Sequence, residues 1–283
     1  MVLQDKHKSQ QGAALLIVIM ITAIMSIIMT LMVHQSRLNM KLATLIKHRA
    51  IGEVALHNAK SAFIYKLMTT PLHLVGPNIK LNNVEFDTLV PDFKGTMVTY
   101  NNVGLSVQDI SGLVSLFPFD EKGFNRLLIE KGYEQDQLLA FSDRFEDWQD
   151  VDSLTRIEGK ERGDYQNYPF LPSNMQLQTL KELEYIIEPQ IYNAISPWLI
   201  LYGQGYINGQ YAPEALYSAA GIQTNSEEYA LSSQSEGGYN YPSGRYLIKL
   251  SFKDKGVSLH KQFLLMRGAD TFQPFFVANE KTF

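Results

Sequence analysis

An uncharged apolar run over residues 12–33, GAALLIVIMITAIMSIIMTLMV, is the feature that most constrains how this chain can fold. After its glycine it offers about 21 residues, enough for a helix to cross the hydrocarbon core of a bilayer. A short hydrophilic leader, MVLQDKHKSQQ, precedes the run. About 250 residues follow, with the mixed composition of a water-soluble globule. The sequence therefore predicts one membrane anchor that carries one large domain.

The length of the run favours an uncleaved span over a secretory signal. A cleaved signal has a shorter apolar core and a small-x-small cleavage site at its far end. This run ends in LMVH at residues 31–34, which offers no such site. Its polar residues, Thr22, Ser26 and Thr30, share one helix face at a spacing of four. Their hydroxyls either bond carbonyls of their own helix or face a partner helix.

Charges around the run bear on its orientation. Lys6 and Lys8 precede it, whereas Arg37, Lys41 and two further basic residues up to position 49 follow it. The positive-inside rule, taken alone, would place the large domain in the cytoplasm.

The start of the run carries a more specific pattern. Gln10, Gln11 and Gly12 are followed at once by the bare apolar sequence AALLIV. This junction resembles the class III signal of type IV pilins and pseudopilins. The resemblance implies that a prepilin peptidase cuts between Gly12 and Ala13 on the cytoplasmic side and methylates the new N-terminus at Ala13. It also implies a large domain in the periplasm, against the charge count.

The fifth position after the implied cut is Ile17, where most of this family has glutamate. The substitution is typical of one branch, the GspK family of minor pseudopilins of type II secretion. A carboxylate in lipid is costly unless it is paired, and in the filament it pairs with the N-terminal amine of the subunit laid down before it. A subunit at the tip has no such amine to pair with. The alternative is that Ile17 is apolar only because the whole helix is.

The helical pattern continues beyond the membrane. Over residues 38–68 apolar side chains recur at helical spacing, and Pro71 ends the pattern. Anchor and extension together would form a helix of about 84 Å. We expect its apolar stripe to pack on a sheet; a membrane-anchored coiled coil is the alternative, but the stripe is short and imperfect as a heptad.

The rest of the chain divides into regions with different sequence patterns. Residues 72–117 have the β-branched residues and Asn, Gly and Pro breaks of strands and turns, and residues 117–202 are helical in pattern. Asp120 is placed to cap a helix that ends at Gly132. Leu138, Phe141, Phe145 and Trp148 mark an amphipathic helix, and TLKE at residues 179–182 is a capping box that opens a helix ending before Pro189.

Residues 224–245 are polar and predict a long loop. A hairpin is expected after it, about residues 254–256. The tail from Thr271 either adds an edge strand or stays loose.

Three of these segments resemble the GspK family. They are DISGLVSL at residues 109–116, which resembles the strand leading into the family's large insert, DWQDVD at residues 147–152, and LQTLKELEYII at residues 177–187. The resemblance implies an α+β fold: a long N-terminal transmembrane helix packed on a pilin-like antiparallel sheet, with a mostly α-helical insert. The expected divisions are leader 1–12, transmembrane part 13–33, stem helix and first strands 34–116, insert 117–223, and loop with closing strands 224–283.

The residues argue against several functional classes. The sequence has no nucleophile elbow, HExxH, P-loop or dinucleotide glycine motif, so we expect no enzyme, and a membrane-anchored periplasmic hydrolase is the least favoured alternative. It has no cysteine, and hence no disulfide or thiol site. Its net charge is −4, and no helix carries a Lys/Arg cluster, which argues against nucleic acid as a partner.

Residues 147–164 form the one candidate ion site. Calcium prefers several clustered oxygen ligands. Asp150, Asp152 and Glu161 fall at positions 1, 3 and 12 of an EF-hand register, but Leu154 and Thr155 break it. The GspK resemblance implies a calcium site of another kind in the insert, and a solvated acidic loop is the alternative. The candidate ligands are Asp147, Asp150, Asp152, Glu158, Glu161 and Asp164.

The resemblance implies a structural function. The chain would cap the tip of a type II secretion pseudopilus together with other minor pseudopilins and help to start its assembly. Its partners would be those pseudopilins, the prepilin peptidase and the inner-membrane secretion platform. It would be anchored by a single pass in the inner membrane. The alternative is a minor pilin of a type IV pilus with an initiating or adhesive role.

Overall fold

The computed structural model describes residues 6–77, 91–166, 171–219, 221, 241–268 and 273–283. Two predicted segments, the strand VEFDTLV at residues 84–90 and most of the loop at 224–245, lie outside the described residues. The chain divides into two compact units. One contains residues 1–55 and 252–259, and the other contains residues 56–251 and 260–283.

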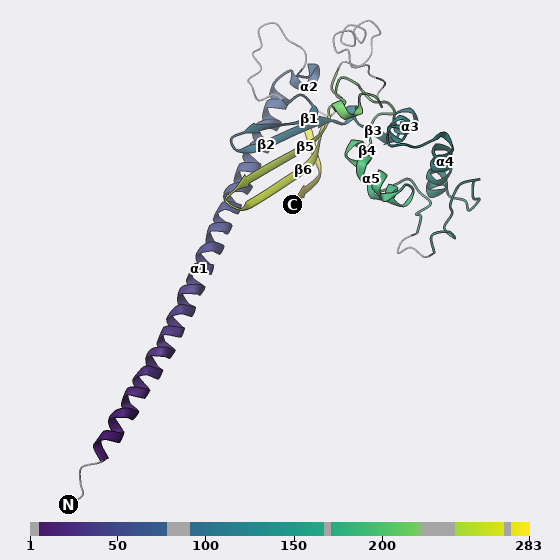
Figure 1. Cartoon of the computed structure of the whole chain (residues 1–283). Coiled ribbons are helices and arrows are strands. Elements are labelled where there is room, and N and C mark those ends of the chain that lie inside the picture. Colours follow the sequence, from purple (N-terminus) through teal and green to yellow (C-terminus); the bar gives the residue numbers. More distant parts are fainter. Residues whose placement is uncertain (1–5, 78–90, 167–170, 220, 222–240, 269–272) are drawn as a thin grey trace, which may run out of the picture. The chain divides into compact units, whose positions relative to one another are not determined.

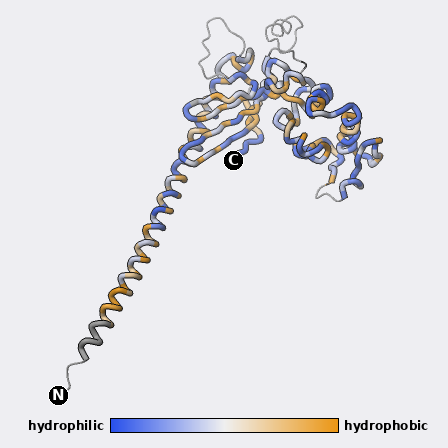
Figure 2. Tube along the Cα trace, in the orientation of Figure 1, coloured by the Kyte–Doolittle hydropathy of each residue, from blue (hydrophilic) through white to orange (hydrophobic). Residues whose placement is uncertain are grey.

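Helix α1 (Lys6–Thr69) forms the anchor and stem (Figure 1). It ends two residues before Pro71, as the sequence predicts. From Ala13 onward it is long and apolar enough to cross a membrane, and Figure 2 shows its hydrophobic turns in orange. The Thr22 hydroxyl donates to the Ile19 carbonyl at 2.9 Å and the Thr30 hydroxyl to the Ser26 carbonyl at 2.8 Å. These two hydroxyls therefore bond their own helix.

The last four turns of α1 bury an apolar face. Leu56, Ala59, Phe63 and Leu67 are all buried, at the spacing of three and four expected of a packed helix. The expected stripe does not extend further back, because its earlier members at residues 38–54 are exposed. In the unit that contains residues 1–55, Gly52 lies against Phe252 and Leu259, where a Cβ would be 2.6 Å and 2.8 Å from their rings and methyls. His48 Nδ1 lies 2.8 Å from Asp254 Oδ2 in the same unit.

A five-stranded sheet has the order β1-β2-β5-β6-β7. The strands are β1 (Lys94–Tyr100), β2 (Val103–Asp109), β5 (Arg245–Asp254), β6 (Val257–Arg267) and β7 (Phe275–Thr282). β1 pairs antiparallel with β2, and β6 pairs antiparallel with β7. The alternating burial of β5 shows one face toward a core and one toward solvent. The predicted hairpin is present, and the C-terminal tail is the edge strand β7.

The sheet combines β1 and β2, which precede the insert, with β5, β6 and β7, which follow it. This combination fixes the topology of the chain. Short helix α2 (Leu72–Val75) occupies the start of the region expected to hold only strands and turns. The 135 residues between β2 and β5 leave and return at neighbouring strands, so the insert is added to the sheet without interrupting it.

The insert contains α3 (Glu121–Glu130), α4 (Gln135–Gln149) and α5 (Pro189–Ile195). Asp120 caps α3 by accepting from the Gly123 amide at 3.1 Å, as predicted. The capping box at Thr179 and Glu182 is also present, but it opens a 3-10 helix, Leu180–Tyr185, in place of the predicted longer helix. Two prolines near the following turns, Pro189 and Pro197, divide this region into short pieces.

One part of the expected helical insert is wrong. β4 (Leu199–Tyr202) is a strand that pairs in parallel with β3 (Val114–Phe117). The two strands and the helices enclose one core, whose largest members include Phe124, Phe141 and Trp148. A four-residue apolar segment is too short to show a period, so only its distant partner decides that it is extended.

A buried polar seam joins the end of β2 to the chain that returns from the insert. Asp109 is fully buried and accepts hydrogen bonds from the Ser111 amide at 2.8 Å and the Ser243 amide at 2.7 Å. Gln108 Nε2 donates to the Tyr211 carbonyl at 2.9 Å. This seam explains why DISG follows β2 directly: the carboxylate satisfies amides that no strand partner would satisfy.

Candidate functional site

The predicted processing site lies at the N-terminal end of α1. Residues 1–5 lie outside the described residues, and for residues 6–12, including Gly12, only the helical backbone is described. Ala13 and Ile17 follow in the same helix, and the Ile17 side chain is 57% exposed. Within Ala13–Val33 no side chain is ionisable. A helix face of this kind requires lipid or apolar partners.

The acidic residues of the insert gather where α4 ends. Asp147, Asp150 and Glu161 each offer a carboxylate oxygen within 4.8 Å of the other two. Calcium binds oxygen at 2.3–2.6 Å, so oxygens on opposite sides of one ion are up to about 5 Å apart. The three residues therefore have a spacing that a single calcium ion could bridge. Asp147 and Glu161 are buried and Asp150 is half-buried.

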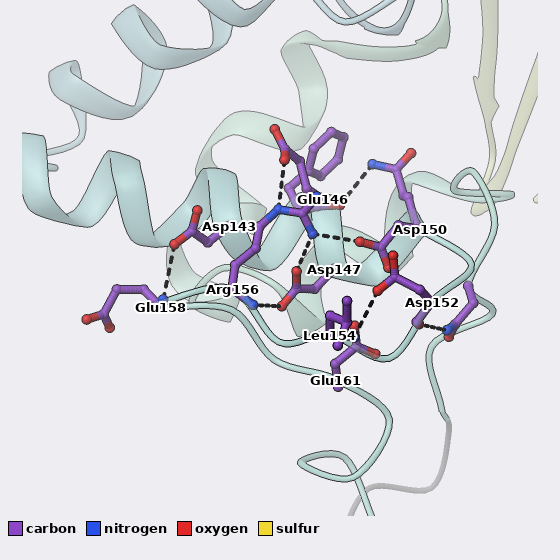
Figure 3. Close-up of polar contacts among 12 residues, drawn as sticks. Asp143, Glu146, Asp147, Asp150, Asp152, Leu154, Arg156, Glu158 and Glu161 are labelled. Atoms are coloured by element: carbon purple, nitrogen blue, oxygen red, sulfur yellow. Dashed lines mark hydrogen bonds and ion pairs between the residues drawn. The ribbon is translucent and has the colours of Figure 1, made fainter.

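Arg156 lies inside this group of carboxylates (Figure 3). Its Nη1 is 2.5 Å from Asp147 Oδ1 and 2.6 Å from Asp150 Oδ2, and its Nε is 2.9 Å from Glu146 Oε2. The Arg156 amide also donates to Asp147 Oδ2 at 3.1 Å. These carboxylates raise the pKa of the guanidinium further above its usual range, through hydrogen bonds to Asp150 and Asp147 first and the charge of Glu146 after. Arg156 is thus a fixed positive charge that the sequence interpretation did not include.

Part of the group has no counter-charge. Both carboxylate oxygens of Glu161, and Oδ1 of Asp150, are buried without a hydrogen bond of ordinary geometry. Burial raises the pKa of Glu161; the Arg162 amide lowers it, and the Asp150, Asp147 and Asp152 charges raise it again. Buried polar atoms without partners are uncommon and call for a ligand or an ion. The oxygens that are present fit a hard divalent cation.

The structure distributes the six predicted ligands between two groups. Asp147, Asp150 and Glu161 come together, whereas the other three are exposed. Asp152 Oδ1 accepts from the Leu154 amide at 2.8 Å, and Asp164 Oδ2 accepts from the Glu161 amide at 2.9 Å, so both shape the loop. The Glu158 carboxylate points away from the group in Figure 3.

Two neighbours could have been suspected from the sequence but were not. Arg156 follows Asp150 by six residues in a stretch dense in carboxylates, where a basic residue is a natural counter-charge. Gly159 has a packing role, because a Cβ there would lie 2.7 Å from Asp147 Cγ. Calcium takes oxygen ligands, and neither of these side chains supplies one, so a pattern of candidate ligands does not indicate them.

Residues 102–204 match the family model described as type II secretion system (T2SS), protein K. The match begins at the turn before β2 and ends just after β4, so it contains the DISG sequence at residues 109–112 and the acidic group. No curated protein matches the sequence.

The fold matches a chain from the crystal structure of the GspK-GspI-GspJ complex of the enterotoxigenic Escherichia coli type 2 secretion system. The TM-score is 0.54 at 13% identity, over 84% of this chain and 98% of that one. A likeness at this identity shows the fold, an α+β fold with a long N-terminal helix. The family match covers residues 102–204, and the fold of the chain agrees with it, so the chain is similar in both sequence and fold to protein K of type II secretion systems.

Proposed function

We propose that this chain is a minor pseudopilin that caps the tip of a type II secretion pseudopilus and helps to start its assembly. The observation that supports the tip is Ile17, in a span without an ionisable side chain. A subunit inside the filament would use a carboxylate at this position to pair with the amine of the subunit laid down before it. A first subunit has no amine to pair, and a lone carboxylate in lipid is costly.

The proposal places the chain as a single-pass inner-membrane protein with its large domain in the periplasm. Its partners are the other minor pseudopilins of the same system, the inner-membrane platform and the prepilin peptidase, which cuts between Gly12 and Ala13 and methylates Ala13. The solved complex contains GspI and GspJ beside GspK, which supports minor pseudopilins as partners of this chain too. Its role is structural, and the peptidase supplies the catalysis.

We also propose that Asp147, Asp150 and Glu161 hold a calcium ion in the periplasm. The support is the spacing of their oxygens and the burial of both Glu161 carboxylate oxygens without a hydrogen bond of ordinary geometry. The ion would add positive charge between carboxylates that otherwise repel one another. Asp152, Glu158 and Asp164, the other predicted ligands, lie at the surface of the same loop.

The tip position has a direct test. On pseudopili assembled to a length that electron microscopy can resolve, an antibody to this chain should label one end of each filament. A cap is present once per filament, whatever the length of the filament. Labelling along the whole length would contradict the tip proposal, and antibody to the major pseudopilin is the control that marks the length.

A further inference from the structure

We propose that Arg156 is a built-in counter-cation that competes with the metal ion for the carboxylates at the end of α4. It would hold the loop after α4 in place when the ion is absent and lower the affinity of the site for the ion. This inference rests on the proposed cation site, and its test separates a failure of the one from a failure of the other.

The loop after α4 is connected to that helix mainly through side chains other than its exposed aliphatic ones. Three aliphatic residues of the loop after α4 face solvent: Val151 is 87% exposed, Leu154 76% and Ile157 96%. Their apolar surface therefore contributes little to docking the loop. Tyr165 packs on Trp148 further along the loop, and closer to α4 the polar contacts of Arg156 to Glu146, Asp147 and Asp150 connect the loop to the last turn of the helix. Removing this side chain should loosen the loop.

The carboxylates around the site outnumber the positive charge that lies among them. Four carboxylates surround the site, those of Glu146, Asp147, Asp150 and Glu161, and one guanidinium lies among them. Arg156 satisfies Asp147 Oδ1 and Asp150 Oδ2 but reaches neither Asp150 Oδ1 nor Glu161. The site is thus neutralised on one side only. Its other side, formed by Asp150 Oδ1 and both oxygens of Glu161, is the open side for a cation.

Arg156 and a metal ion would compete for the same carboxylates. A metal ion that binds the Glu161 carboxylate would also contact the carboxylates of Asp147 and Asp150. Oxygens of these two residues already accept hydrogen bonds from Arg156. Two positive charges on shared carboxylates repel each other, and each weakens the other's contacts. Arg156 is 36% exposed at its side chain, so it can turn to solvent and still contact Glu146 at the surface. The protein would exchange one cation for another at the same buried carboxylates.

The test compares four full-length proteins, purified from membranes in detergent: the unchanged chain, R156Q, E161Q and R162Q. Arg162 carries the same charge in the same loop and is exposed, so R162Q is the matched control for a change in net charge. Calcium affinity is measured by titration calorimetry, with magnesium as a control for ionic strength. Thermal midpoints are measured by tryptophan fluorescence in EDTA and in calcium, since Trp148 adjoins Asp147.

We expect R156Q to bind calcium about tenfold more tightly or better, because it loses a like charge beside the ion. In EDTA its midpoint should fall below that of the unchanged chain, and calcium should restore it. E161Q should lose calcium binding and keep or raise its midpoint in EDTA, because a neutral amide replaces a buried charge without a partner. R162Q should behave as the unchanged chain.

If the unchanged chain binds calcium and R156Q binds it equally or more weakly, Arg156 does not compete and the inference is wrong, while the cation site stands. If neither the unchanged chain nor R156Q binds calcium, the proposed cation site itself is wrong. If R156Q binds more tightly but is as stable in EDTA as R162Q, Arg156 does not hold the loop, and that half of the inference fails.

Discussion

Replacing Trp148 by alanine should destabilise the insert by about 3–5 kcal/mol, the cost of deleting a large aromatic side chain from a packed core. Trp148 is 2% exposed. Its ring meets the edge of Tyr165 at a centroid distance of 5.2 Å and stacks on Tyr185 at 6.0 Å. Its Nε1 donates to Glu182 Oε2 at 3.2 Å. The residue therefore ties α4 to the loop that follows it and to the 3-10 helix at Leu180–Tyr185.

Thermal unfolding by circular dichroism measures this effect, since the substitution removes a fluorescence probe. W148F keeps most of the ring volume and loses only the Nε1 hydrogen bond, so it should cost much less. Leu139 lies on the same helix and is 57% exposed, which makes L139A the control for a helix substitution outside the core. A W148A protein as stable as L139A would show that this region is not packed as described.

A methyl group at Gly112 should cost about 3 kcal/mol or more, because it has no space. A Cβ there would overlap the Tyr211 carbonyl and lie 2.7 Å from the Ala212 nitrogen. These neighbours are backbone atoms, so no side chain can rotate away. The segment that contains them is fixed by the Asn208 amide, which donates to the Ser111 carbonyl at 2.7 Å. Accommodating the methyl would require this seam to open.

Gly163 provides the matched control for Gly112. It is exposed, and a Cβ at this position would meet nothing within 4 Å. Chemical denaturation of G112A and G163A should therefore give a large loss of stability in the first and almost none in the second. Equal stabilities would mean that the returning chain does not lie against β2 in this way.

Local signals were enough to predict much of this fold. The uncharged run, Pro71, the cap at Asp120 and the amphipathic spacing of α4 each act within a few residues, and each prediction is confirmed. The hairpin about residues 254–256 is confirmed for the same reason. Features of this kind depend on backbone and capping preferences that a sequence shows directly.

Features that depend on distant partners were not predicted. β4 is extended because it lies beside β3, more than eighty positions earlier, and nothing within Leu199–Tyr202 signals this. The capping box at Thr179 was recognised, but the length and type of its helix were set by surrounding packing. At the acidic group, proximity of Asp147, Asp150 and Glu161 could be guessed from their density in the sequence. The sequence offers Arg156 as a nearby counter-charge, but its contacts with both Asp147 and Asp150 depend on how the loop folds back on α4.

We propose that this chain is a pilin-class subunit, and the intact mass of the membrane-extracted protein decides between this proposal and an ordinary single-span protein. The protein should be purified from a strain with the prepilin peptidase and from a matched strain without it. With the peptidase we expect a mass that lacks residues 1–12 and carries one added methyl group on Ala13; without it we expect the full-length mass. An intact N-terminus in both strains would contradict the claim. The basic residues after the span, such as Arg37 and Lys41, would then favour the opposite orientation.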